Sequence, residues 1–181
     1  HRLAALQRLD LQYNRIRSLH PKAFERLGRL EELCLGNNLL PALAPGLAKL
    51  RFLDLSGNQQ SSLRHPDIFG PLRSLHTLLL ASNSLQQLMG GLFQHLPGLA
   101  KLSLSGNRLL RLEGNLLSHL PAALLEPLSS LEALDLSRNA PRALPNQTFG
   151  FKALRLVLMV LKCASCTSAG GLDTFALCRA V

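Results

Sequence analysis

Leu50-Arg51-Phe52-Leu53-Asp54-Leu55-Ser56-Gly57-Asn58 is one copy of a phrase, Leu-x-x-Leu-x-Leu-x-x-Asn, that the 181-residue chain repeats. Recognisable copies begin at six leucines, Leu6, Leu30, Leu50, Leu75, Leu99 and Leu131. Self-similarity at intervals of about 20 to 50 residues is typical of repeat proteins, in which each unit packs only against its neighbours. The sequence therefore predicts a solenoid rather than an irregular globule.

The centre of the phrase, Leu-x-Leu, has the period of two that is typical of a short β-strand. In each copy the two leucines should face the core: Leu9 and Leu11, Leu33 and Leu35, Leu53 and Leu55, Leu78 and Leu80, Leu102 and Leu104, Leu134 and Leu136. Successive strands should pair in parallel about 4.8 Å apart. Pro, Gly and Ser in the outer arcs favour turns and short helical pieces. The predicted fold class is α/β, a solenoid with a parallel sheet on one side and irregular or short helical segments opposite.

Each copy closes with an asparagine where the strand ends and the chain turns inward: Asn14, Asn38, Asn58, Asn83, Asn107 and Asn139. Backbone groups at such a turn lose water and need partners. A side-chain amide offers two donors and one acceptor, so these residues should form a ladder of hydrogen bonds along the solenoid. We interpret all six as structural.

Several copies depart from the phrase. The second is short, and Pro41, Pro45 and Gly46 compress its outer arc, while the third has Gln60 where Leu is usual. The fifth is too long, and its residues 116–121 are echoed by residues 124–129, which makes a doubled outer arc at 116–130 that should bulge from the convex side or an edge. A neutral duplication, a splicing variant and a docking element all remain open for it. The phrase dissolves near the end, so we divide the chain into a solenoid at 1–155 and a degenerate C-terminal repeat or cap at 156–181.

Composition supports a folded, basic chain. Apolar residues make up 47% and charged residues 17%, which excludes disorder, and the formal net charge is +9. Many basic residues fall in the first thirty positions, so the N-terminal end could attract a polyanion. The alternative is an ordinary solvated surface with the same composition. No apolar run approaches the roughly 18 residues that span a bilayer. Because the sequence begins inside a repeat, without an initiator Met, we expect a piece of a longer protein or a processed product.

The cysteines fall into two groups. Cys34 stands alone between Leu33 and Leu35, in the outward position of its strand, and is expected to be an exposed, tolerated thiol; pairing with another chain and an intracellular location are the alternatives. Cys163, Cys166 and Cys178 lie near the end of the chain, where one disulfide is the leading interpretation. Zinc is the weaker one, because a zinc site needs four ligands and this segment has three cysteines.

No motif for catalysis is present. Nucleophile-elbow, phosphate-loop and dinucleotide-binding signatures are missing, and the six histidines occur singly. Asp10, Asp54 and Asp135 share one strand position, but Cys34, Leu79 and Ser103 occupy it in the other copies. We therefore predict no enzyme, no cofactor and no metal.

The 24-residue phrase with a phenylalanine on its outer arc resembles the extracellular class of leucine-rich repeats found in Toll-like receptors and secreted leucine-rich glycoproteins. The resemblance covers about residues 6–155. It implies a horseshoe whose parallel sheet lines a concave face that binds protein or microbial ligands, in an extracellular, cell-surface or endosomal ectodomain. The sequon at Asn146 fits the secretory route. A secreted carrier or matrix glycoprotein that forms a stable protein complex, and an intracellular scaffold, are the alternatives.

Side chains that flank the inward leucines should line the concave face. Most are small or polar, and we predict ligand contacts at the exceptions and their neighbour: Tyr13, Phe52, Thr77 and Leu79. A protein ligand, a co-receptor or a second copy of the chain is the expected partner. Six short strands project roughly 400 Å², which is below the roughly 800 Å² that each partner buries in a standard complex. The flanks, or further repeats, should therefore contribute.

Overall fold

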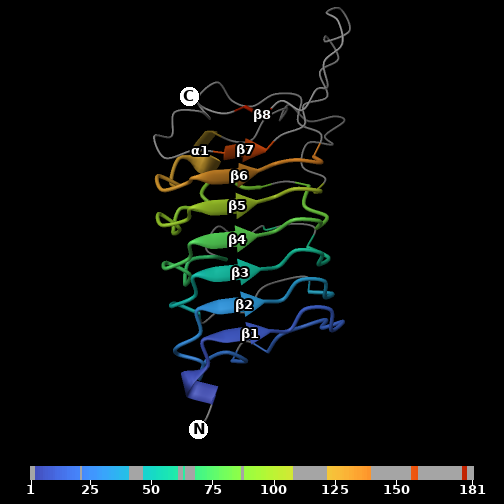
Figure 1. Cartoon of the computed structure of the whole chain (residues 1–181), viewed down its shortest axis with the longest axis vertical. Coiled ribbons are helices and arrows are strands. Elements are labelled where there is room, and N and C mark those ends of the chain that lie inside the picture. The colour runs from blue at the N-terminus through green and yellow to red at the C-terminus, as the bar shows by residue number, and fades with distance from the viewer. Residues whose placement is uncertain are drawn as a thin grey trace, which may run out of the picture.

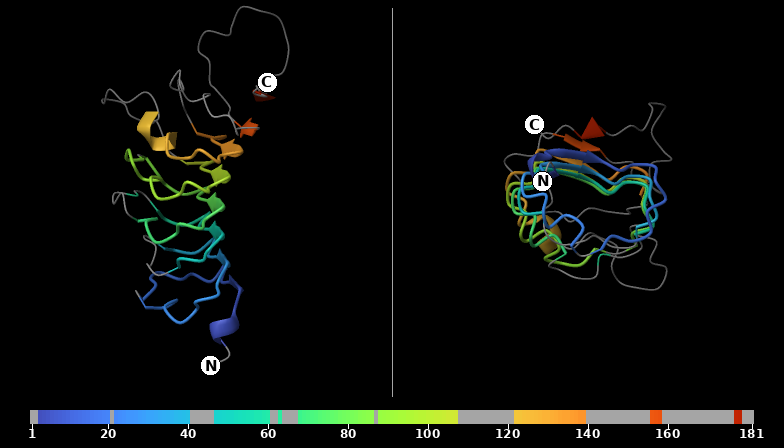
Figure 2. Two further views of the ribbon diagram at one scale, coloured as in Figure 1. Left: turned by 90° about the vertical axis from the view of Figure 1, so that its left-hand side faces the viewer. Right: turned by 90° about the horizontal axis from the view of Figure 1, so that it is seen from below.

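A computed structural model describes residues 3–20, 22–40, 47–60, 63, 68–86, 88–107, 122–139, 156–158 and 177–178. In this part of the chain each copy of the phrase forms one coil, and the coils stack into a column with the strands along one side and the arcs opposite (Figures 1 and 2). The first and last described elements, the 3-10 helix η1 (Leu3–Ala5) and the strand β8 (Leu177–Cys178), lie at opposite ends of the column (Figure 1).

The described strands form one eight-stranded sheet in chain order. They are β1 (Arg8–Asp10), β2 (Glu32–Cys34), β3 (Phe52–Asp54), β4 (Thr77–Leu79), β5 (Lys101–Ser103), β6 (Ala133–Asp135), β7 (Leu156–Leu158) and β8 (Leu177–Cys178). All neighbours from β1 to β7 pair in parallel, whereas β8 runs antiparallel to β7. The predicted α/β solenoid with a parallel sheet is confirmed.

The core consists of stacked leucines, as the period-two pattern predicts. The middle residues of β1 to β6 pair in register: Leu9, Leu33, Leu53, Leu78, Leu102 and Leu134. From the second coil onward these residues are buried, while Leu9 is only partly buried. The reason is geometric, because a coil at the end of the described column has a neighbour on one side only.

The outer arcs close the other side of the core with larger side chains. Phe24, Phe69 and Phe93 are buried, and the rings of Phe69 and Phe93 stack with centroids 6.0 Å apart. In the fifth copy the corresponding place, nine residues before the middle of the strand, belongs to Leu125 at the end of the short helix α1 (Ala122–Leu125). The second half of the doubled arc therefore supplies the core. Its first half lies outside the described residues.

The asparagine side chains bridge successive coils. Asn58 Nδ2 donates to the Leu55 carbonyl of its own coil at 3.0 Å and to the Leu35 carbonyl of the preceding one at 2.9 Å, while Oδ1 accepts from the Leu40 amide at 3.0 Å. The amide nitrogens of Asn38, Asn83, Asn107 and Asn139 donate to the matching pairs of carbonyls. Asn14 differs, because its exposed amide donates to Gln12 within its own turn. It lies in the first coil, which has no described coil before it to bridge.

The residue before each of these asparagines has a positive φ: Tyr13, Asn37, Gly57, Ser82, Gly106 and Arg138, with values from 52° to 67°. This left-handed geometry aims the following amide into the coil, and it favours glycine or asparagine. A Cβ at Gly57 would also meet the side-chain oxygen of Asn37 in the neighbouring turn. The residues between each strand and its asparagine thus form the same type of backbone turn in each coil.

Gln60 is a polar residue inside the leucine core. Its side chain is fully buried, and among the described residues neither its amide nitrogen nor its oxygen has a hydrogen-bond partner. Replacing Gln60 with leucine, the residue usual at this place, should raise the free energy of unfolding by about 1–3 kcal/mol, because two unpaired polar atoms leave the core. Urea denaturation followed by circular dichroism measures the gain. The exposed neighbour Gln59 is the control, and an equal gain from Gln59→Leu would contradict the explanation.

The sheet continues beyond the sixth copy. Leu156 pairs with Ala133 and Leu158 with Asp135, so β7 occupies the place of a seventh repeat strand. The division of the chain into a solenoid at 1–155 and a cap at 156–181 stays a prediction.

Candidate functional site

The outer face of the sheet, which the resemblance predicts to be concave and which we call the concave face, presents two outward columns of side chains. The first outward column contains Arg8, Glu32, Phe52, Thr77, Lys101 and Ala133. The second outward column contains Asp10, Cys34, Asp54, Leu79, Ser103 and Asp135. Each column takes one residue from each of the strands β1 to β6, so neighbours along a column are about 4.8 Å apart.

The structure brings together three of the four predicted contact residues. Phe52 pairs with Thr77, and Leu79 follows Thr77 on the same face of β4. Phe52 and Leu79 are half-buried, and Thr77 between them is buried. Tyr13 lies apart, in the turn after β1 and two strands away, where 75% of it is exposed. A role in ligand binding stays a prediction for all four.

The aspartates of the second outward column have a structural task. Asp10, Asp54 and Asp135 each accept a hydrogen bond from the backbone amide two residues later, at 2.8 to 3.0 Å. Asx turns of this kind are a common use of aspartate at strand ends. Gln12 Nε2 also donates to Asp54 Oδ2 at 3.1 Å, passing over Gly36 of the coil between them. These carboxylates therefore shape the turns, and they form no acid–base pair.

Cys34 does not have the exposed thiol that its outward position predicted. It is 5% exposed, because both flanking strands place longer side chains beside it in the column, Asp10 on one side and Asp54 on the other. Burial raises the pKa of the thiol, the charges of Asp10 and Asp54 raise it further, and Arg8 opposes them. The thiol is protonated at neutral pH and is a poor nucleophile.

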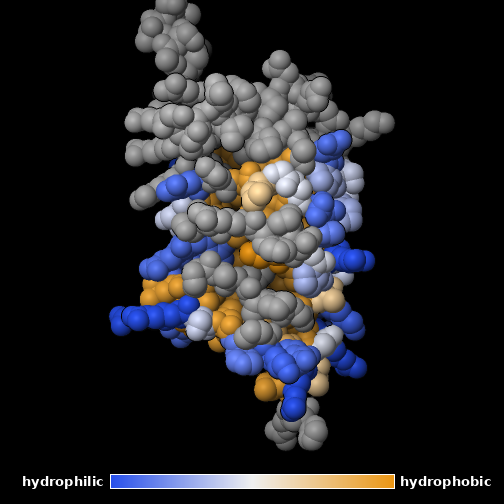
Figure 3. Space-filling view, turned by 180° about the vertical axis from the view of Figure 1, so that it is seen from behind, coloured by the Kyte–Doolittle hydropathy of each residue, from blue (hydrophilic) through white to orange (hydrophobic). Residues whose placement is uncertain are grey.

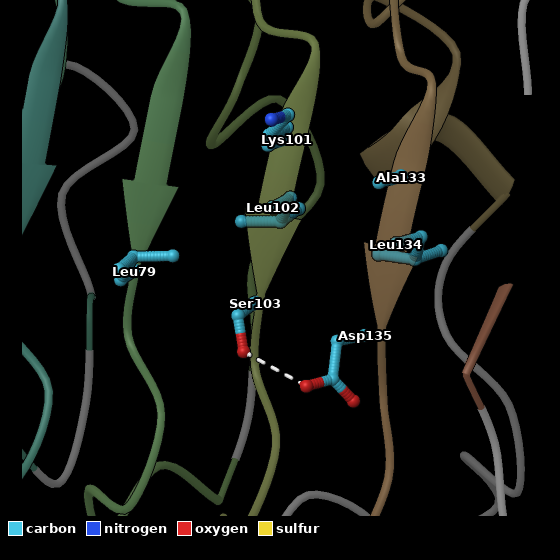
Figure 4. A pocket seen from close by; sticks show the side chains of 7 residues that line it. All are labelled: Leu79, Lys101, Leu102, Ser103, Ala133, Leu134 and Asp135. Atoms are coloured by element: carbon cyan, nitrogen blue, oxygen red, sulfur yellow. Dashed lines mark hydrogen bonds between the residues drawn. The ribbon is translucent and has the colours of Figure 1, made fainter. Parts of the chain in front are cut away.

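A shallow hollow opens on the concave face beside Leu79. It spans three strands, has a volume of about 110 Å³, and is lined almost entirely by apolar surface from Leu79, Lys101, Leu102, Ser103, Ala133, Leu134 and Asp135. We call it the Leu79 hollow. Figure 4 shows Leu79 on one side, Lys101 and Ala133 toward the strand starts, and Ser103 donating a hydrogen bond to Asp135 at 3.2 Å. Pockets for cofactors and drug-sized ligands are typically about 300–1,000 Å³, so this space suits a single apolar side chain.

Sequence reasoning found Leu79 but missed the rest of the hollow. The sequence contained part of the signal for the hollow, because Ala133 is the smallest residue of the first outward column and leaves space there. A short side chain predicts a hollow only when its neighbours are known, and strand pairing in the structure identifies those neighbours. Lys101 and Asp135 carry opposite charges at this rim and could orient a polar partner group around an apolar anchor.

Other predicted sites lie outside the described residues. Asn146, Cys163 and Cys166 are among them, and Cys178 is described only as part of the β8 backbone. Within the described ranges, no group of three or more His, Cys, Asp or Glu side chains is placed to hold a metal ion.

None of the helices in the described part of the chain combines the length and apolar character required to cross a bilayer.

Known proteins resemble this chain in sequence and in structure. Residues 3–59 and 64–109 match a family model described as Leucine rich repeat, and residues 49–72 match a second model of the same description. Opticin of Mus musculus is 40% identical over 91 residues, which are 50% of this chain and 28% of opticin. Podocan-like protein 1 of Mus musculus is 44% identical over 85 residues, which are 45% of this chain and 15% of that protein. The matches thus span less than a third of each relative.

A solved structure shares the coil arrangement. The TLR13–ssRNA13 complex superposes with a TM-score of 0.74 and 28% identity, covering 86% of this chain and 21% of that one. These matches confirm the resemblance drawn from the repeated phrase. The relatives are matrix or secreted proteins and a Toll-like receptor, not enzymes, which confirms the prediction that this chain is not an enzyme and supports an extracellular or endosomal location.

Proposed function

Because this chain belongs to the leucine-rich repeat family, we propose that it is a binding module that holds a protein partner against its concave face, with one apolar side chain of the partner in the Leu79 hollow. The observation that carries the proposal is that hollow, apolar inside and flanked by the opposite charges of Lys101 and Asp135. Buried apolar anchors surrounded by polar groups supply much of the energy in protein interfaces.

The wider setting that we propose is an extracellular receptor ectodomain that recognises a protein or microbial ligand. A secreted carrier or matrix glycoprotein in a stable protein complex is the second candidate, supported by the similarity to opticin and podocan-like protein 1. An intracellular scaffold is the third. The full-length transcript separates them, because a membrane span with a cytoplasmic module supports the receptor, a signal peptide alone supports the carrier, and neither supports the scaffold.

The concave-face proposal is tested by surface substitution. The chain is first screened against displayed secreted proteins and microbial surface products, and the affinity of each partner is then measured by surface plasmon resonance. Ala133→Arg fills the Leu79 hollow with a charged side chain and should weaken binding by about tenfold or more, which corresponds to about 1.4 kcal/mol. Met89→Arg places the same side chain on the exposed outer arc and should leave the affinity unchanged. Equal losses from both variants, or none from Ala133→Arg, would exclude the concave face.

A further inference from the structure

Basic side chains gather along one edge of the sheet. Arg29, Lys49, Arg51 and Arg73 precede β2, β3 and β4, and all four residues are exposed. We call them the basic edge. Figure 3, seen from behind, shows hydrophilic side chains along the right-hand side of the molecule, where the strands begin.

Strand pairing places these residues near the strand starts of three successive coils. Arg29 and Lys49 each lie three residues before a paired position, Glu32 and Phe52, and so occupy the same place in adjacent coils. Arg51 lies two residues after Lys49 in the same coil, where its amide donates to the Glu31 carbonyl at 2.8 Å and its carbonyl accepts from the His76 amide at 2.8 Å. Arg73 lies in the next coil, one residue before Ser74, which is the equivalent of Lys49. With about 4.8 Å between strands, the basic edge extends roughly 10 Å along the solenoid axis.

No ion pair between residues that the structure describes neutralises the basic edge. Among the described residues the one ion pair joins Arg8 to Glu32 at 3.4 Å, and it involves no member of the edge. Glu31, which is half-buried beside Arg51, is the acidic residue within the row. Among the described residues the row thus holds four cations and one carboxylate, an excess of positive charge that can attract an external anion.

The basic edge is not the basic N-terminal end that the sequence indicated. The first coil spreads its cations around its circumference, since Arg8 lies on the concave face, Arg15 and Arg17 follow the turn after β1, and Lys22 lies on the outer arc. Arg29 is the cation of that segment that strand pairing aligns with Lys49. Stacking of coils, and not local sequence density, creates the concentrated charge.

The surroundings of the row discriminate between polyanions. Single-stranded nucleic acid is usually held by a basic track together with aromatic side chains that stack on successive bases. The aromatic residue closest in the chain is Phe52, which is half-buried on the concave face and offers no such series. In the described part of the chain, the exposed large apolar residues that would enter a lipid surface are Leu3, Tyr13 and Met89, and none of these three belongs to this edge.

We propose that the basic edge binds a linear sulfated polysaccharide lying along the solenoid axis. Arginine guanidinium groups make paired hydrogen bonds to sulfate-like oxygens, and a row of cations on successive coils matches a chain that carries an anionic group on successive sugars. This surface is separate from the Leu79 hollow, so a protein on the concave face and a polysaccharide on the edge can bind together.

The test measures heparin affinity by isothermal titration calorimetry at several salt concentrations. The variant Lys49→Gln/Arg51→Gln/Arg73→Gln should bind about tenfold or more weakly. The magnitude of its slope of log affinity against log salt should fall by about 2, because each contact formed with a flexible polyanion releases about 0.7 counterions and three contacts are lost. The matched control Arg15→Gln/Arg17→Gln/Arg138→Gln removes the same charge from exposed residues elsewhere and should change affinity less than about threefold. Circular dichroism verifies that both variants are folded.

Three outcomes would overturn the proposal. Equal losses from both triple variants would mean that heparin responds to net charge alone. Unchanged affinity of the first variant would exclude the basic edge. A single-stranded RNA of matched length and charge that binds as tightly as heparin, and is lost in the same variant, would replace the polysaccharide with a nucleic acid. Binding of the protein partner to Ala133→Arg is measured separately, so failure here leaves the concave-face proposal standing.

Discussion

Replacing Leu53 with alanine is expected to lower the free energy of unfolding by about 2–5 kcal/mol, the range for leucines deleted from a packed core. Leu53 is fully buried and lies between its register partners Leu33 and Leu78. Backbone hydrogen bonds hold the neighbouring strands about 4.8 Å away, so the coils cannot move together to fill the space. The cavity should persist, which places the loss toward the upper part of the range. Urea denaturation followed by circular dichroism measures it.

Leu9→Ala is the matched control for this prediction. Leu9 holds the same strand position in the first coil, but it is only partly buried and packs against the coil of Leu33 on one side. Less apolar surface returns to water when its side chain is shortened, so the loss should be about 1–2 kcal/mol. A loss at Leu9 as large as that at Leu53 would contradict a core built of layers that each depend on two neighbours.

Asn58→Ala should lower the free energy of unfolding by about 1–3 kcal/mol for each buried backbone group that it leaves unpaired. The Asn58 side chain is 5% exposed, and it satisfies the carbonyls of Leu35 and Leu55 and the amide of Leu40. The Leu35 and Leu55 carbonyls keep a second donor each, the side chains of Asn38 and Asn83, so the Leu40 amide is the buried backbone group that loses its partner. Thermal unfolding followed by circular dichroism should show a clearly lower midpoint.

Two further variants separate the ladder from general effects of substitution. Asn14→Ala changes an exposed amide that bonds only within its own turn, so its effect should stay within about 0.5 kcal/mol. Asn58→Asp keeps the shape and the acceptor but loses the donor that bridges two coils, and should also destabilise. Wild-type stability of Asn58→Asp would show that the bridging donor contributes nothing.

The fold could be predicted because its signal is local and repeated. Leucines at a period of two define each strand, and an asparagine at a constant distance marks each turn, so six copies report the same structure independently. The parallel pairing and the inward leucines follow from this regularity. Even the turn conformation is regular, with a positive φ before each ladder asparagine.

The candidate site was predictable only in part. Leu79, Phe52 and Thr77 could be placed on one face from the strand period, and the pairing of β3 with β4 joins them. The burial of Cys34 was missed because it depends on the length of Asp10 and Asp54 in adjacent coils, which are 24 and 20 residues away in sequence. The hollow was missed for the same reason, since it is the space that Ala133 leaves between longer neighbours.

The sequence by itself determined the coil: where each strand begins, which side chains enter the core, and where an amide must close the turn. These properties depend on residues a few positions apart, and the residue pattern that determines them recurs in each repeat. Tertiary structure decided what the coils present to a partner, namely the buried thiol of Cys34, the Leu79 hollow and the basic edge. Each of these arises between side chains of different coils, whose register is set by hydrogen bonds across the sheet and by the unequal lengths of the arcs, so no single repeat contains the information.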